Sequence, residues 1–100
     1  MKWLILFSIF SLNLNAKTFT VEMSLNRFIP QNLTIKRGDT VTFVNKTNVV
    51  HNVVSPEFQL RSKYMRKGDK YSITFKDEMQ VKYYCELHKN MGMEGTIEVI

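Results

Sequence analysis

The sequence predicts an all-β domain, built as a sandwich or barrel of short strands. β-Branched and aromatic residues gather in short runs, and turn-forming residues separate these runs about every ten residues. Residues 57–64 are compatible with either a short helix or an irregular loop, and no other stretch beyond the N-terminal apolar run has convincing amphipathic helix spacing. The chain has 100 residues, which is enough for one domain.

The first predicted strand covers residues 18–23, where Phe19, Val21 and Met23 alternate with polar residues. The same criteria of β-branched runs between polar turns predict the later elements. Strands are expected over residues 33–35, 41–44, 51–54, 71–75, 81–85 and 96–100, and turns over residues 36–39, 45–48, 55–56 and 65–69.

Residues 1–16 have the features of a secretory signal peptide. Lys2 gives a positive start, an apolar run follows, and Ala16 ends it on a small residue. The apolar run is shorter than the roughly 20 residues that a transmembrane helix needs. Cleavage is predicted after Ala16, although Leu14 is larger than the residue usually found three positions before such a site. We therefore expect export, by default to a bacterial periplasm, and a mature domain over residues 17–100.

The chain has a single cysteine, Cys85, so no disulfide can form within it. A lone thiol in an oxidising compartment is open to oxidation unless a metal, a covalent partner or deep burial protects it. Both histidines, His51 and His88, complete a candidate metal set with Cys85, and either Met91 or Met93 could add a thioether. Two imidazoles, one thiolate and a weak thioether are the ligands of a blue copper electron-transfer site.

The net charge is +5, and a basic cluster contributes to it. Such a cluster is either a solvated face or a docking surface for an acidic partner. Nucleic acid is disfavoured, because the chain has an export signal and no nucleic-acid motif. The basic cluster consists of Arg61, Lys63, Arg66, Lys67 and Lys70.

Three segments together resemble the cupredoxins of the plastocyanin and pseudoazurin type. They are residues 28–45, the motif His51-Asn52-Val53, and the loop from Tyr83 to Gly95. The resemblance implies a Greek-key β-sandwich or barrel of about seven to eight strands. It also implies one type 1 copper ion held by His51, Cys85, His88 and Met93.

The resemblance implies roles for three further features. Asn52 would tie the two ligand loops together, the edge of His88 would be the main electron route, and Tyr84 would offer a second route. The chain departs from the family pattern at Leu87, where proline is usual, and at Met79 and Val81. The segment that is acidic in plant plastocyanins is basic here.

Spacing leaves two candidates for the axial ligand. Plastocyanin-like spacing indicates Met93, and amicyanin-like spacing indicates Met91. The chain offers no nucleophile–base pair and no second cysteine for a dinuclear copper centre, so we expect no catalysis.

The leading interpretation is a monomeric electron shuttle between redox proteins that present acidic docking surfaces, with no membrane span once the leader is removed. Two alternatives remain: copper storage, delivery or resistance, and a metal-free binding sandwich.

Overall fold

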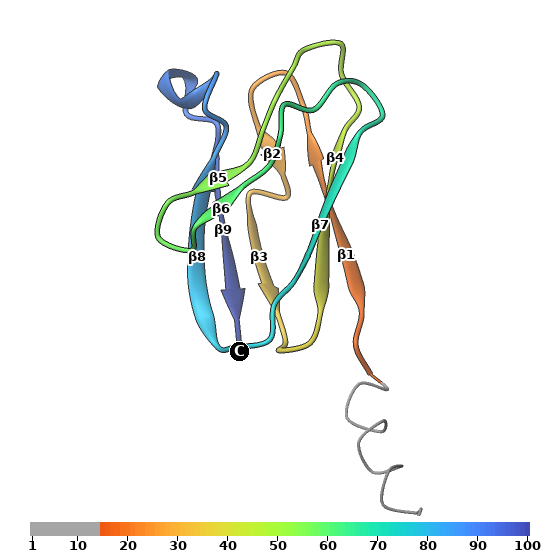
Figure 1. Ribbon diagram of the computed structural model, residues 1–100, viewed down its shortest axis with the longest axis vertical. Helices are drawn as coiled ribbons and strands as arrows, with labels where there is room; N and C mark the ends of the chain where they lie inside the picture. The colour runs from red at the N-terminus through yellow and green to blue at the C-terminus, as the bar shows by residue number, and fades with distance from the viewer. Residues whose placement is uncertain (1–14) are drawn as a thin grey trace, which may run out of the picture.

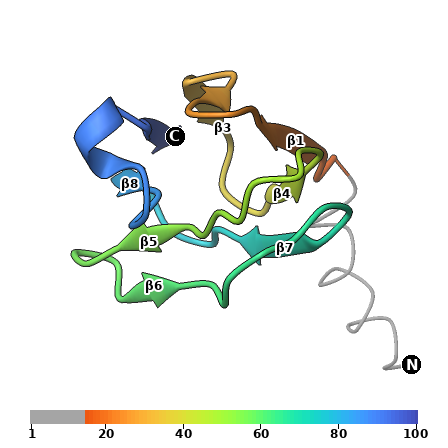
Figure 2. The ribbon, with the colours of Figure 1, turned by 90° about the horizontal axis from the view of Figure 1, so that it is seen from above.

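The computed structural model describes residues 15–100, which form two β-sheets around one hydrophobic core (Figure 1). The four-stranded sheet has the order β2-β1-β4-β7, and the five-stranded sheet has the order β3-β9-β8-β5-β6. Seen from above, the sheets curve around a common interior (Figure 2). This arrangement confirms the predicted all-β sandwich.

The nine strands vary in length, and three of them have only two residues. Their bounds are β1 (Thr18–Met23), β2 (Phe28–Ile29), β3 (Asn32–Ile35), β4 (Thr40–Asn45), β5 (Val54–Ser55), β6 (Leu60–Arg61), β7 (Lys70–Thr74), β8 (Met79–Tyr84) and β9 (Glu94–Val99).

Strand β1 has the alternation that the sequence predicts. Val21 and Met23 are buried, whereas Thr20 is exposed and Glu22 is half-buried. β1 runs parallel to β4, with Val21 opposite Phe43, so the buried faces of both strands meet the same core. The turn between β3 and β4 contains Gly38 with a φ of 96°, a backbone conformation that glycine adopts at low cost.

The second sheet brings the C-terminal strands together. β8 pairs antiparallel with β9, and β3 pairs parallel with β9 on its other side. The predicted strand over residues 81–85 begins earlier, at Met79, and ends at Tyr84. Cys85 is therefore the first residue after β8, and it is fully buried.

Two predictions change in the structure. The expected strand over residues 51–54 is reduced to a bridge between His51 and Met65 and the short strand β5. The ladder is interrupted because the Val53 amide donates to the Ser62 hydroxyl instead of to a neighbouring strand. The sequence of residues 57–64 is compatible with a short helix or an irregular loop. In the structure these residues form most of the β5–β6 hairpin and the segment after it.

The core lies between the two sheets, and aromatic residues fill its centre. Tyr83 packs edge-on against Phe28 and Phe43, with ring centroids 4.8 and 5.2 Å away. Phe75 is also buried, and Phe19 packs against the cluster from a partly exposed position. Burying each of the large side chains contributes about 1.5–3 kcal/mol. Among the described residues, the core side chains come from residues 19–99.

The predicted signal peptide lies, except for Asn15 and Ala16, outside the described residues. Within residues 15–100, no helix has the length and apolar character needed to cross a membrane.

Candidate metal centre

The three predicted nitrogen and sulfur ligands meet at one end of the sandwich. Cys85 Sγ lies 3.6 Å from His51 Nδ1 and 3.4 Å from His88 Nδ1. One ligand atom from each residue falls within 4.8 Å of the others. His51 and Cys85 are 34 positions apart in the chain, so the fold itself creates this cluster.

His51 is held rigidly on the connection between β4 and β5. Its side chain is fully buried, and its amide and carbonyl both bond to Met65, at 3.1 and 2.7 Å. Asn45 stabilises the pairing of His51 with Met65, because its Nδ2 donates to the carbonyls of Val49 and Met65, both at 2.8 Å. The imidazole is thus positioned by backbone bonds on both sides.

The loop after Cys85 is closed by its own backbone. The Cys85 amide donates to the Met93 carbonyl at 3.0 Å, and the Met93 amide donates to the His88 carbonyl at 3.3 Å. A 3₁₀ turn over Lys89–Met91 lies between them. Gly92 ends that turn with a φ of 78°, as the left-handed conformation requires.

Gly95 is needed for space and not for conformational freedom in the ligand loop. It lies in β9, not in the loop. A Cβ there would lie 2.8 Å from the Gln31 carbonyl oxygen and would collide with the Tyr83 hydroxyl. Glycine is required at this position because neighbouring atoms leave no room for a side chain.

The two candidate axial methionines lie in opposite environments. Met93 is fully buried in the core cluster, whereas Met91 is 65% exposed. Met93 is also bonded through its backbone to Cys85 and His88. An axial thioether must reach the buried side chains of Cys85 and His51 from the interior, so this contrast favours Met93.

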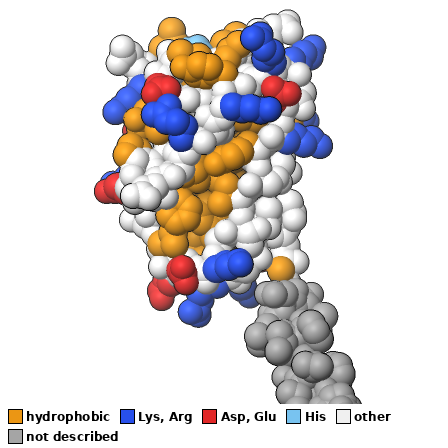
Figure 3. Space-filling model, in the orientation of Figure 1, with side chains coloured by type: hydrophobic (Ala, Val, Ile, Leu, Met, Phe, Trp, Pro, Cys, Tyr) orange, Lys and Arg blue, Asp and Glu red, His pale blue; other side chains and the backbone are white. Residues whose placement is uncertain are grey.

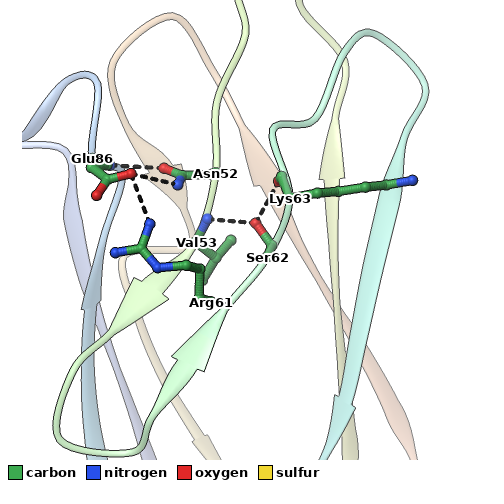
Figure 4. Close-up of polar contacts among 6 residues, drawn as sticks. All are labelled: Asn52, Val53, Arg61, Ser62, Lys63 and Glu86. Carbon is green, nitrogen blue, oxygen red and sulfur yellow. Dashed lines mark hydrogen bonds and ion pairs between the residues drawn. The ribbon is translucent and has the colours of Figure 1, made fainter.

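A polar network joins the loop of His51 to the loop of Cys85 (Figure 4). Asn52 Oδ1 accepts the Glu86 amide at 2.8 Å, and Asn52 Nδ2 donates to Glu86 Oε1 at 3.2 Å. Arg61 from β6 donates to the same Oε1 at 2.9 Å. Glu86 has its pKa lowered, chiefly by the bond from Arg61 and also by Asn52. The structure thus places Asn52 where it links the two loops.

Sequence reasoning missed Glu86 and Arg61 as members of this network. They are 25 positions apart, and no spacing rule connects them. It also missed Ser62, whose buried hydroxyl accepts the Val53 amide at 2.9 Å and donates to the Lys63 carbonyl at 2.8 Å (Figure 4). The Ser62 amide in turn donates a hydrogen bond to the Val53 carbonyl at 2.9 Å. Together these bonds fix the segment after β6 beside the segment that bears His51.

The surroundings of His51 favour its neutral imidazole. Burial lowers the pKa of His51, and the neighbouring His88 lowers it further, against a smaller opposing effect of the Ser24 backbone. Neutral imidazole is the form that binds a metal ion.

One side of the cluster reaches the surface. His88 is half-buried, whereas His51 and Cys85 are fully buried. Exposed apolar side chains belong to the loops at this end, namely Leu25, Leu87 and Met91. Figure 3 shows hydrophobic side chains around a histidine at the end of the molecule away from the uncertain N-terminal residues. An imidazole edge within an apolar surface is a short path from a buried centre to a docked protein.

The donor set fits a copper ion. Two imidazole nitrogens and one thiol sulfur converge from separate loops, and a buried thioether lies in the same loop as two of them. Soft sulfur suits Cu(I) and imidazole suits Cu(II), so this combination serves both oxidation states.

Comparisons with known proteins agree with this chemistry. The family described as copper binding proteins, plastocyanin/azurin family, matches residues 15–100. The chain is 33% identical over 113 residues to plastocyanin of Nostoc punctiforme, covering 93% of this chain and 81% of that protein. It is 37% identical over 83 residues to chloroplastic plastocyanin of Chlamydomonas reinhardtii, covering 72% of this chain. The match spans just over half, 57%, of the Chlamydomonas protein.

Solved structures of amicyanin share the fold. An oxidised amicyanin mutant matches with a TM-score of 0.76 and 29% identity, covering 82% of this chain and 81% of that one. A Cu(I) form of another amicyanin mutant matches with a TM-score of 0.77 and 28% identity, covering 83% and 82%. With its two-sheet fold, its His-Cys-His cluster and these relatives, the chain belongs to the plastocyanin/azurin family of copper-binding proteins, and copper is its cofactor.

Proposed function

We propose that this protein carries single electrons between redox proteins, with one type 1 copper ion held by His51, Cys85, His88 and Met93. The observation that carries the proposal is the convergence of two imidazoles and a thiol within 4.8 Å at one end of a rigid sandwich. Bound copper supplies a Cu(I)/Cu(II) couple. The chain's own residues hold the ligand geometry, exclude water and provide the exposed edge of His88.

Burial favours retention of copper over copper delivery. Exchange between proteins requires ligands that an acceptor can reach, and His51, Cys85 and Met93 are all fully buried. The backbone bonds on both sides of His51 also keep the ligands in place when the charge of the centre changes. Little rearrangement accompanies transfer, so we expect fast electron exchange and no catalysis by the protein itself.

The test is the visible spectrum of the copper-loaded protein beside a Cys85→Ser control. We expect an intense thiolate-to-copper band that a mild reductant bleaches and an oxidant restores over repeated cycles without loss of copper. The control should lack the band. A pale wild-type protein with the spectrum of the control would refute the copper shuttle. Loss of copper on each reduction would favour storage or delivery.

We also propose export of the protein, with residues 1–16 as a signal peptide and a bacterial periplasm as destination. The support is the order of charge, apolar run and small residue that ends at Ala16. In that compartment a bound metal protects the single thiol from oxidation.

The proposed partners are proteins with acidic docking surfaces, which this protein meets as a monomer. Arg61 is paired with Glu86, but no ion pair within residues 15–100 engages Lys63, Arg66 or Lys67. These three flank Met65, which bonds to His51, so they lie near the ligand cluster.

The docking proposal predicts a dependence on ionic strength. Electron transfer to an acidic partner should slow steeply as salt is added, because screening weakens steering. Replacing Lys63, Arg66 and Lys67 by glutamine should flatten that dependence. Replacing Lys17, Lys36 and Lys76, which lie in segments at the opposite end of the strands, should not. A salt-independent rate in the wild-type protein would contradict the proposed surface.

A further inference from the structure

A buried carboxylate lies at the end of the sandwich opposite the metal centre. Asp39 follows the β3–β4 turn and is only 4% exposed. Its Oδ1 accepts the amide of Lys17 at 2.9 Å, and its Oδ2 accepts the amide of Lys36 at 2.9 Å. These two bonds hold its pKa below the usual value. Asp39 is therefore charged at neutral pH while shielded from solvent.

This carboxylate has no cationic side chain as a partner. The ion pairs within residues 15–100 are Lys46–Glu22 and Arg61–Glu86, and neither involves Asp39. Both of its donors are neutral amides. Buried carboxylates are ordinarily paired directly with a cation, whereas the charged side chains of Lys17 and Lys36 act on Asp39 from nearby and lower its pKa less than the two amide bonds do.

Lys17 is the first residue that the sheet holds. Its carbonyl accepts the Thr40 amide at 2.9 Å, and β1 begins at the next residue. Asn15 and Ala16 are exposed, so the bond between Ala16 and Lys17 is at the surface. This is the bond that the leader pattern marks for cleavage.

We propose that hydrolysis of the Ala16–Lys17 bond supplies a direct counter-ion, because the new α-ammonium of Lys17 pairs with the buried Asp39 carboxylate. A signal peptidase adds water across the bond, so that Ala16 leaves with a carboxylate and the Lys17 nitrogen becomes an ammonium. The nitrogen already lies 2.9 Å from Asp39 Oδ1. Cleavage thus converts a neutral hydrogen bond into a charge-assisted one without moving either group.

The surroundings accommodate this change. A surface cavity of about 330 Å³ borders Lys17, Lys36, Asp39 and Ile100, leaving room for the added hydrogens of an ammonium. The C-terminus lies at the same end, where the Ile100 amide donates to the Ile35 carbonyl at 2.9 Å. Figure 1 places this end away from the loops beyond β8 that carry Cys85 and His88. Processing therefore stabilises the fold without altering the copper site.

The inference rests on the proposed export, and the exported protein provides its first test. The full chain is expressed in a secreting host, and the intact mass of the purified protein is measured. We expect a chain that begins at Lys17. A mature chain that begins elsewhere would overturn the inference, and the copper spectrum of the same sample would still report separately on the proposed function.

The decisive test compares a chain beginning at Lys17 with one beginning at Ala16, which moves the ammonium away from Asp39. Each is made in the wild-type, Asp39→Asn and Asp69→Asn backgrounds. Asp69 is the matched control, because its Oδ2 accepts the Arg66 amide at 2.8 Å in an equivalent turn. In urea unfolding we expect the Lys17 chain to have about a fivefold higher ratio of folded to unfolded protein in wild type and Asp69→Asn. The two chains should be equal in Asp39→Asn.

Equal stabilities in the wild-type background, or a difference that survives in Asp39→Asn, would overturn the inference. If Asp39→Asn does not fold, the wild-type chain beginning at Lys17 still tests the inference. Its α-amine, held as an ammonium against a carboxylate, should react several-fold more slowly with an acylating reagent than the amine of an unfolded peptide of the same sequence. An equal rate would overturn the inference.

Discussion

At the scale of single residues, the clearest contrast is between the two methionines of the ligand loop. Met93 is fully buried and Met91 is largely exposed, although they are two positions apart. The left-handed turn at Gly92 separates them and directs them to opposite sides. The loop conformation therefore selects one thioether for the interior.

The first prediction concerns these methionines. Met93→Leu should keep the thiolate-to-copper band and raise the reduction potential, because a thioether that stabilises Cu(II) is lost. Each tenfold change in the relative affinity for the two oxidation states corresponds to about 59 mV. Met91→Leu should leave the potential unchanged. Cyclic voltammetry of both variants checks this, and a shift in Met91→Leu alone would identify Met91 as the axial ligand.

The second prediction concerns Asn52, which is almost fully buried and bonds twice to Glu86. Asn52→Ala leaves the Glu86 amide without its acceptor, which should lower the free energy of unfolding by about 1–3 kcal/mol. Glu86→Gln should have little effect on stability, because its pair with Arg61 is solvent-exposed and the bond from its amide remains. Urea unfolding of the metal-free proteins measures both. A Glu86→Gln effect as large as that of Asn52→Ala would contradict this account.

At the scale of secondary-structure elements, the close contact of β9 with β8 explains a glycine. Gly95 pairs with Tyr83 across the two strands, and its missing side chain leaves space for the Tyr83 ring. The tyrosine in turn packs against Phe28 and Phe43 from the other sheet. One absent Cβ thus permits an aromatic contact between the sheets.

The third prediction follows from that contact. Gly95→Ala should lower the free energy of unfolding by about 1–3 kcal/mol, as overpacking does. Gly68→Ala is the control: a Cβ there meets no atom within 4 Å, so only its φ of 90° costs energy, about 1 kcal/mol. Adding Tyr83→Phe to Gly95→Ala should recover only a small part of the loss, because the ring carbon Cζ, which phenylalanine keeps, and the Gln31 carbonyl still block the methyl group. An unchanged free energy of unfolding in Gly95→Ala would show that β8 and β9 can move apart there at no cost in stability.

At the scale of the whole molecule, the two ends of the sandwich have separate roles. The loops at one end hold the copper ligands, and the turns at the other end hold both Asp39 and the C-terminal residue. The strands connect the ends through a continuous core. Substitutions at the Asp39 end can therefore change stability without contacting the copper ligands.

The fourth prediction concerns stability in acid. The folded-state pKa of Asp39 is lowered, first by the bond from the Lys17 amide and then by that from Lys36. Its contribution to stability is therefore complete above the unfolded-state pKa of about 3.9, and it is lost as pH falls through the folded-state pKa. Asp39→Asn should be less stable at pH 7 and should lose less stability between pH 5 and acid. Thermal unfolding of the metal-free proteins measures the slopes, and identical slopes would contradict the assignment.

Much of the fold follows from local pattern. The alternation of Phe19, Val21 and Met23 predicted β1 correctly, because a strand must face one side to the core. The prediction over residues 51–54 was wrong in part, because the Val53 amide bonds to a side chain that lies nine positions later. Local pattern describes what a segment prefers, and it does not identify the distant group that satisfies its backbone.

By itself the sequence determined the all-β class, the types of donor atom and the loop spacing from Cys85 to Met93, because each depends on neighbouring residues. Tertiary structure alone decided which methionine is buried, that Arg61 and Glu86 join Asn52, and that Asp39 receives the amide of Lys17. The physical reason is that a β-sandwich joins segments distant in the chain, 22 positions apart for Lys17 and Asp39 and 34 for His51 and Cys85. Only the folded chain brings such groups within bonding distance.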